Sequence, residues 1–355
     1  MLRSFLVILI LTAGCAAAFA KAPKHPDSYA YTRGVEAFNA ENYTEAREWF
    51  DRELAEHPDN GYAYIYITSM QYADNEFGKA LTSANKAIKV LPKKDKEWRA
   101  IAYASRSEIH AALQDTVDAL ADLARAIEID GTNLKFYGSR AQIYYEQRQY
   151  DLSDADYRVI ANLDAGDVTG YMGQGRNARD RGQWAEAVAF FDRAIRLEPE
   201  FSQAYAFRAE AYVALVRWSE ATDDIVKALD IDGNDKAFNL MQELPDEVSD
   251  ILKSKLKIQM AKQSSNRYWP YCLGIIAMAN ENYDEAITYF EKANSIDANS
   301  VFHEMIAKCY KGKKNYNRAL DYADRALAMS PDDYDVIDLK ADLFSALGQY
   351  DRALE

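Results

Sequence analysis

Apolar residues recur every three or four positions along most of the chain, which is the spacing of one face of an α-helix. The stretch RGQWAEAVAFFDRAIRLEPE at 181–200 shows this pattern. Its apolar positions are Trp184, Ala187, Val188, Phe191, Ala194 and Ile195. The preceding segment 170–182 is a second helical stretch, and its Gly175 and Ala178 are small enough to let a neighbouring helix approach closely. The sequence therefore predicts a helical hairpin in this region.

The same hairpin pattern recurs at a regular distance. Each copy has a small anchor residue, three positions after an aromatic one in all copies except that of Ala119, at Ala46, Ala80, Ala119, Ser153, Ala187, Ala221, Ala286, Ala319 and Ala353. Six of the eight steps between these anchor residues are 33 or 34 residues long, and the step of 65 corresponds to two copies. Such a period is typical of stacked structural repeats, in which each hairpin buries the apolar face of the next.

This period and the order of the packing residues resemble the tetratricopeptide repeat family, whose pattern is W-x2-L-G-x2-Y, then A-x3-F, then Ala and Pro. The matching residues in three copies are Tyr171, Gly175, Ala187, Phe191, Ala194 and Pro199, then Leu273, Gly274, Ala286, Phe290 and Ala293, then Gly34, Ala46, Phe50 and Pro58. The resemblance covers about residues 27–355 and implies an all-α, right-handed superhelical solenoid of antiparallel helix hairpins. In such a solenoid the first helices line an extended concave surface that binds proteins or peptides.

The pattern departs from the family in two places. About five extra residues lie near 92–100, and the unit at 236–267 has lost its signature. Pro245 shortens a helix there, and few packing aromatics follow, so we expect this unit to be the softest joint. The expected organisation is a signal peptide at 1–20, six repeats at 21–235, the degenerate repeat at 236–267, and the last repeats at 268–355. Because the final hairpin is incomplete, we also expect the natural chain to continue past Glu355.

The charge of the protein argues against nucleic acid as a partner. The 355 residues include 56 acidic and 42 basic residues, which gives a net charge of −14. Binding to phosphates requires clustered Lys and Arg, and an acidic protein of this kind is not expected to supply such a surface. Only 15 Gly and 8 Pro are present, which favours helices over sheet turns.

The first twenty residues have the features of an export signal. A basic start at Arg3 precedes a short apolar run, and Ala18-Phe19-Ala20 is placed like a cleavage site before Lys21. The apolar run is shorter than the roughly 20 residues that a spanning helix needs, so no transmembrane span is expected in the mature protein. The segment LTAGC resembles the lipobox of bacterial lipoproteins, so lipidation of Cys15 is the alternative. The expected location is the periplasm or cell envelope, or the outer membrane if Cys15 is lipidated.

No catalytic or metal-binding motif stands out in the sequence. The four histidines, His25, His57, His110 and His303, lack the spacing of metal ligands, so structural or solvated roles are expected for them. No catalytic residue, cofactor or metal is therefore expected. Cys272 and Cys309 are expected to be buried as small apolar side chains, and whether they pair is left open.

Candidate partner-binding residues come from the first helix of each copy. The resemblance places on the concave face the aromatic residues Tyr31, Phe38, Tyr62, Tyr72, Tyr145, Tyr268 and Tyr271. Aromatic side chains offer large, rigid contact areas in recognition surfaces. The competing interpretation is that they pack between successive first helices.

The same face carries a basic group in two consecutive copies, formed by Lys135, Gln142, Arg176 and Arg179. Glu210 is a further candidate groove residue. Arginine suits a carboxylate, so the expected ligand is an acidic segment or the free C-terminus of a partner. The competing interpretation is solvated charge, or pairing with Asp180 and Glu210. The Lys and Asn arrangement of the family's best-known carboxylate clamp has no counterpart at these positions, so that activity is not carried over.

These patterns together favour an exported, non-catalytic scaffold or adaptor that binds a protein or peptide partner. One alternative is the docking arm of a longer enzyme or assembly factor that continues beyond residue 355. A weaker alternative is a surface lipoprotein that binds glycans or peptides by aromatic stacking.

Overall fold

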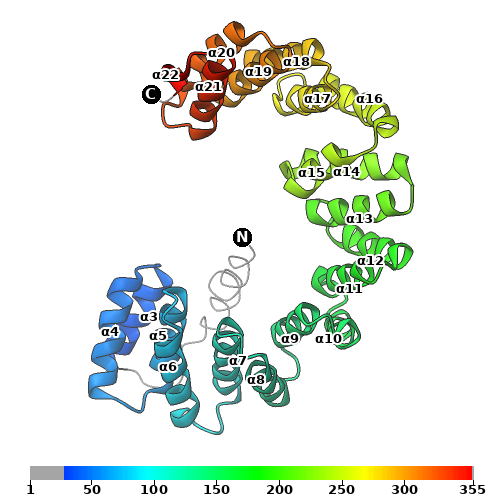
Figure 1. Ribbon diagram of the computed structural model, residues 1–355. Helices are drawn as coiled ribbons and strands as arrows, with labels where there is room; N and C mark the ends of the chain where they lie inside the picture. The colour runs from blue at the N-terminus through cyan, green and yellow to red at the C-terminus, as the bar shows by residue number, and fades with distance from the viewer. Residues whose placement is uncertain (1–27, 354–355) are drawn as a thin grey trace. The chain divides into compact units, whose positions relative to one another are not determined.

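The computed structural model describes residues 28–353, which form twenty α-helices and no strand. The expected signal peptide, Cys15 and His25 lie outside the described residues. Consecutive helices pair as antiparallel hairpins, as Figure 1 shows, so the predicted all-α hairpin architecture is confirmed. No helix in the described part of the protein is both long enough and apolar enough to cross a membrane.

The protein divides into two compact units, with the division between Asn177 and Ala178 inside one helix. In the first unit the second helix of one hairpin packs against the first helix of the next. This contact joins α4 to α5, α6 to α7 and α8 to α9. The helices of this unit are α3 (Tyr29–Asn39), α4 (Tyr43–Glu56), α5 (Gly61–Ala73), α6 (Phe77–Val90), α7 (Lys96–Ala112), α8 (Thr116–Ile129), α9 (Leu134–Glu146), α10 (Tyr150–Leu163) and the part of α11 (Val168–Asp180) up to Asn177.

The second unit is built in the same way from the end of α11 onward. Its further helices are α12 (Trp184–Leu197), α13 (Ser202–Ala214), α14 (Trp218–Asp232), α15 (Asp235–Glu243), α16 (Asp246–Lys262), α17 (Tyr268–Ala279), α18 (Tyr283–Ile296), α19 (Ser300–Gly312), α20 (Tyr316–Met329), α21 (Tyr334–Ala346) and α22 (Tyr350–Ala353). Contacts between successive hairpins include those of α12 with α13, α18 with α19 and α20 with α21.

The anchor residues of the sequence pattern lie at the tightest points of the hairpins. Eight of the nine predicted anchors, all except Ala353, are completely buried. The constant spacing also explains two glycines, because a Cβ on Gly34 would lie 2.7 Å from Phe50 and one on Gly274 would lie 2.5 Å from Phe290. Each glycine therefore makes room for the aromatic residue of the second helix in its own hairpin.

The turn inside each regular hairpin uses one residue in the left-handed region. This residue lies five positions before the anchor, at Glu41, Asn75, Gln114, Arg148, Gly182, Val216, Glu281, Lys314 and Gly348. Only two of the nine are glycines, although glycine adopts this conformation at the lowest cost. The turn geometry is therefore imposed by helix packing more than by local residue preference.

The extra residues near 92–100 lengthen α7 at its start. Helix α7 has 17 residues, against 13 in α5, and Asp95 caps it by accepting a hydrogen bond from the backbone N–H of Trp98. Trp98 is buried and packs edge-on against Tyr62, with 5.3 Å between the ring centres. The insertion thus covers part of the first-helix surface of the second hairpin.

The degenerate repeat is shaped by Pro245, as the sequence predicted. Helix α15 has only nine residues, and α16 begins directly after Pro245. Helix α16 packs against α14 and α17 and buries Val248, Leu252 and Leu256. Aliphatic side chains therefore supply the core that aromatic residues supply elsewhere, so the expected shortage of packing is not found in α16.

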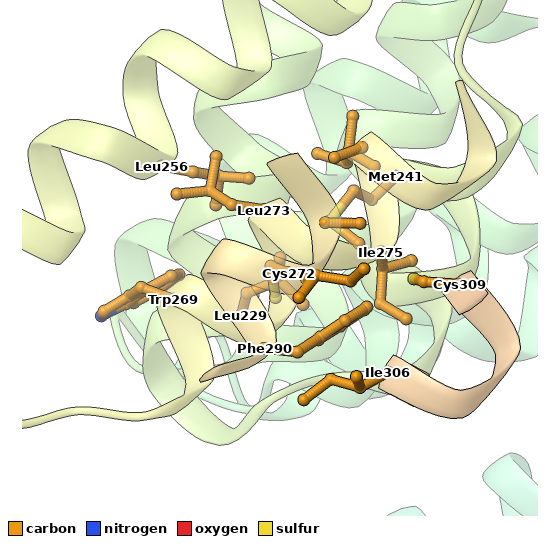
Figure 2. Packing of buried hydrophobic residues seen from close by; sticks show 14 of the residues in the cluster. Leu229, Met241, Leu256, Trp269, Cys272, Leu273, Ile275, Phe290, Ile306 and Cys309 are labelled. Carbon is orange, nitrogen blue, oxygen red and sulfur yellow. The ribbon is translucent and has the colours of Figure 1, made fainter. Parts of the chain in front are cut away.

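These aliphatic residues belong to a continuous core that runs through the second unit (Figure 2). Leu256 lies in the same cluster as the fully buried Trp269 and Phe290. Cys272 and Cys309 also belong to it, and both are buried free thiols. Their predicted burial is confirmed.

Candidate functional site

Three of the predicted groove aromatics are core residues. Tyr31, Phe38 and Tyr62 keep only 4%, 6% and 5% of their surface exposed, so assigning them to a partner-binding groove is wrong in this structure. Tyr31 and Phe38 pack against Tyr66, and Trp98 of the next hairpin packs on Tyr62 in the same core cluster. The hydroxyl of Tyr62 donates a hydrogen bond to Asp95 at 2.6 Å. This bond ties Tyr62 to the start of α7, the helix that carries Trp98.

Tyr72 is partly buried and lies beside Phe77 of the same hairpin, with 5.5 Å between ring centres. Burial, followed by the charge of Glu108, raises the pKa of Tyr72 to about 12, so its hydroxyl stays protonated at neutral pH. Tyr72 is therefore only partly accessible at the surface of the first unit.

The basic group predicted on the first helices is partly preserved in the first unit. We call Lys135, Gln142, Tyr145 and Arg176 the basic face, since they lie on α9 and on the part of α11 in this unit. The guanidinium of Arg176 lies 4.4 Å from the ring centre of Tyr145. Among the described residues no carboxylate lies within ion-pair distance of Arg176 or of the exposed Lys135. Gln142 is partly exposed and donates to Glu146 at 2.9 Å.

Glu108 on α7 affects the charge of this face. Burial raises the pKa of Glu108 to about 8, although the positive charge of Lys135 opposes the shift. Much of this carboxyl group is therefore protonated at neutral pH, and it neutralises Lys135 only in part. The basic face thus keeps two cations that no internal carboxylate saturates.

Arg179 lies in the second unit and has a different environment. It pairs with Asp180 at 2.6 Å and with Glu210 at 3.5 Å, and Lys236 also contacts Glu210, at 2.8 Å. Arg179 and Lys236 both lie over the ring of Phe207. For Arg179 the structure thus favours the competing interpretation, pairing with Asp180 and Glu210.

Tyr268 and Tyr271 form an aromatic group with residues of neighbouring first helices in the second unit. Tyr271 stacks on Phe238 with ring centres 5.9 Å apart and also contacts Phe302 at 5.8 Å. Both tyrosines are only partly buried. The second unit therefore carries a row of rings along α15, α17 and α19, partly available to a ligand.

A recurring ion pair was not predicted from the sequence. In three hairpins an arginine of the first helix lies over a tyrosine three residues before it and makes a bidentate bond to an aspartate 16 residues later, which we call the arginine latch. The three sets are Tyr103, Arg106 and Asp122, then Tyr137, Arg140 and Asp156, then Tyr205, Arg208 and Asp224. The constant spacing of 16 is the signal that could have revealed it.

Comparison with known families agrees with the hairpin architecture. The family model described as Tetratricopeptide repeat matches residues 31–97 and 172–236. A second model, described as Regulator of microtubule dynamics protein 1-3, matches residues 276–351. The matches thus fall in both compact units.

Curated relatives and solved structures give the same result. Tetratricopeptide repeat protein 16 of Mus musculus is 26% identical over 190 residues, which cover 53% of this chain and 22% of that protein. Mitochondrial import receptor subunit TOM70 of Homo sapiens is 29% identical over 146 residues, which cover 40% of this chain and 23% of that protein. The chain therefore spans less than a quarter of the length of either relative.

Among solved structures, the C-terminal part of a TPR repeat-containing protein from Cytophaga hutchinsonii superposes with a TM-score of 0.54 at 15% identity, covering 75% of this chain and 95% of that one. At this identity the likeness concerns the fold alone. The stacked hairpins, their buried anchors and these matches together show that the chain carries tetratricopeptide repeats at 31–97 and 172–236.

Proposed function

We propose that this protein is an exported, non-catalytic scaffold that binds a protein or peptide partner on its first helices. The basic face carries the proposal. Lys135 and Arg176 lie on consecutive first helices of the first unit, and neither makes an ion pair with a described carboxylate, in a protein with a net charge of −14. Stacking on Tyr145 leaves the N–H donors of Arg176 available for a carboxylate of the partner.

The surrounding arginines support this choice of site. Arg140 on the same helix as Lys135 donates through Nε and Nη2 to Asp156, so its charge is already paired within the hairpin. A partner carboxylate would therefore meet Arg176 and Lys135 before it could compete for Arg140. The expected partner is a segment with acidic side chains or a free C-terminus.

Photocrosslinking can test where the partner binds. A photoreactive phenylalanine analogue at Gln142, on a first helix, should form adducts with the partner in an envelope fraction. The same group at Leu152, which is 48% exposed on the second helix α10, is the matched control and should form far fewer adducts. Equal adduct formation at both positions would contradict binding on the first helices.

Export rests on the sequence of the first twenty residues and has its own test. Intact-mass measurement of the protein from its native cells should give a mature form that begins at Lys21. A diacylglyceryl adduct on Cys15 would show that the protein is instead a lipoprotein, and an unprocessed start at Met1 would contradict export altogether.

A further inference from the structure

Three potential metal ligands meet at the turn between α7 and α8 in the first unit. His110 lies near the end of α7, Asp115 is the N-cap of α8, and Asp118 lies in the first turn of α8. One ligand atom from each lies within 4.8 Å of the other two. The distance from His110 Nδ1 to Asp115 Oδ2 is 3.6 Å. Two ligands that are each about 2.1 Å from a tetrahedral zinc ion lie roughly 3.4 Å apart, so these two atoms are almost at the required separation.

The backbone of the turn holds the three residues together. The backbone N–H of Asp115 donates to the carbonyl of His110 at 2.8 Å, and the Asp115 side chain accepts from the N–H of Asp118 at 3.3 Å. The next hairpin has the same turn, but the residues 34 positions later are Tyr144, Gln149 and Leu152. Both hairpins therefore have the same turn geometry. Of these two, only the hairpin of α7 and α8 has metal-ligating side chains at the three positions.

A fourth side chain lies next to the imidazole, on the side of its second ring nitrogen. The Nε2 atom of His110 faces Asp122 Oδ2 at 4.0 Å. Asp122 is buried and receives two hydrogen bonds from Arg106, at 2.8 and 2.6 Å. At 4.0 Å this contact is longer than a hydrogen bond, so Asp122 is a neighbour of the imidazole and not a partner that fixes its orientation. Arg106 cancels the charge of Asp122, which leaves the charges of Asp115 and Asp118 to attract a divalent cation.

We propose that His110, Asp115 and Asp118 form a binding site for a divalent transition-metal ion, with Zn²⁺ as the best fit. One imidazole and two carboxylates suit Zn²⁺ better than Ca²⁺ or Mg²⁺, which take oxygen ligands almost exclusively. The side chain of Asp115 is 46% exposed, so an ion can enter from solvent and water can fill the remaining coordination position. The bound ion would tie the end of α7 to the start of α8.

Calorimetric titration with Zn²⁺ tests this site on the mature protein. The wild-type protein should show one saturable site with micromolar affinity. The double variant Asp115→Asn/Asp118→Asn should lose at least tenfold in affinity, and asparagine at position 115 keeps the N-cap. The control Asp51→Asn/Asp59→Asn removes the same charge from exposed positions of the first unit and should bind like the wild type.

Cobalt provides a second measurement that does not depend on the net charge. Co²⁺ should give visible absorption bands with the wild-type protein, and His110→Gln should abolish them because the nitrogen ligand is lost. Circular dichroism should show equal helicity in all variants. The proposal is overturned if the wild type has no saturable Zn²⁺ site, or if the ligand variants bind both ions as the wild type does.

Discussion

Each regular hairpin turns on one residue in the left-handed region, and most of these residues are not glycine. The most unfavourable case is Val216, a β-branched residue with φ of 58° and 65% of its surface exposed. Left-handed backbone costs a residue with a Cβ about 1–2 kcal/mol. The sequence did not reveal these positions, because glutamate, arginine, lysine and valine carry no local turn signal.

Val216→Gly should therefore stabilise the second unit by about 0.5–1 kcal/mol, since glycine relieves the strain but makes the unfolded state more flexible. The measurement is the midpoint of chemical denaturation. Gly182→Ala is the matched control in the equivalent turn, where φ is 74° and a Cβ would meet no atom within 4 Å. It should destabilise by about 1 kcal/mol. A lower denaturation midpoint for Val216→Gly than for the wild type would contradict the claim that the backbone at Val216 is strained.

The arginine latch gives a second prediction at this scale. Asp156→Asn should lower the stability of the first unit by about 2–4 kcal/mol, because it leaves the guanidinium of Arg140 largely buried without its counter-charge. Replacing both Arg140 and Asp156 with leucine should recover much of that loss, since no unpaired charge remains. If Asp156→Asn leaves the denaturation midpoint unchanged, the arginine latch contributes nothing to the stability of the first unit.

At the scale of elements, the hairpins could be predicted because the anchors recur at a fixed period and every anchor helix has one apolar face. The exposure of the candidate groove side chains could not be predicted in the same way. The periodicity of a helix identifies its apolar face, but it does not show what the next hairpin places against the remaining faces. Tyr62 is buried because the insertion brings Trp98 onto it, and Arg179 is neutralised by Glu210 of the next first helix. For Lys135 and Arg176 the prediction stays open, since neither makes an ion pair with a described carboxylate.

Helix α16 provides the test at this scale. Leu256→Ala should destabilise the second unit by about 2–4 kcal/mol, because Leu256 is completely buried in its core. Ile258→Ala on the same helix is the control, since Ile258 is 54% exposed, and it should change stability by less than about 0.5 kcal/mol. Equal effects of the two variants, or fast amide exchange throughout α16, would instead support the soft joint expected from the sequence.

At the scale of the whole molecule, the protein is acidic, repetitive and organised as two compact units. Repetition supplies the core of each unit, because no single hairpin can bury both of its apolar faces. The residues that vary between repeats are then free to differ in chemistry. In the first unit Lys135 and Arg176 lie on consecutive first helices, and neither makes an ion pair with a described carboxylate, whereas Arg106 and Arg140 are each paired with an aspartate of their own hairpin.

The most direct measurement of the central claim is the affinity of the crosslinked partner for the wild-type protein and for Arg176→Glu. If the partner's carboxylate contacts Arg176, the variant should bind at least tenfold more weakly, which corresponds to about 1.4 kcal/mol, with unchanged helicity. Arg158→Glu makes the same charge change at an exposed position of α10 and should bind within about twofold of the wild type. Equal affinity of Arg176→Glu and the wild type would contradict the proposed function of the basic face.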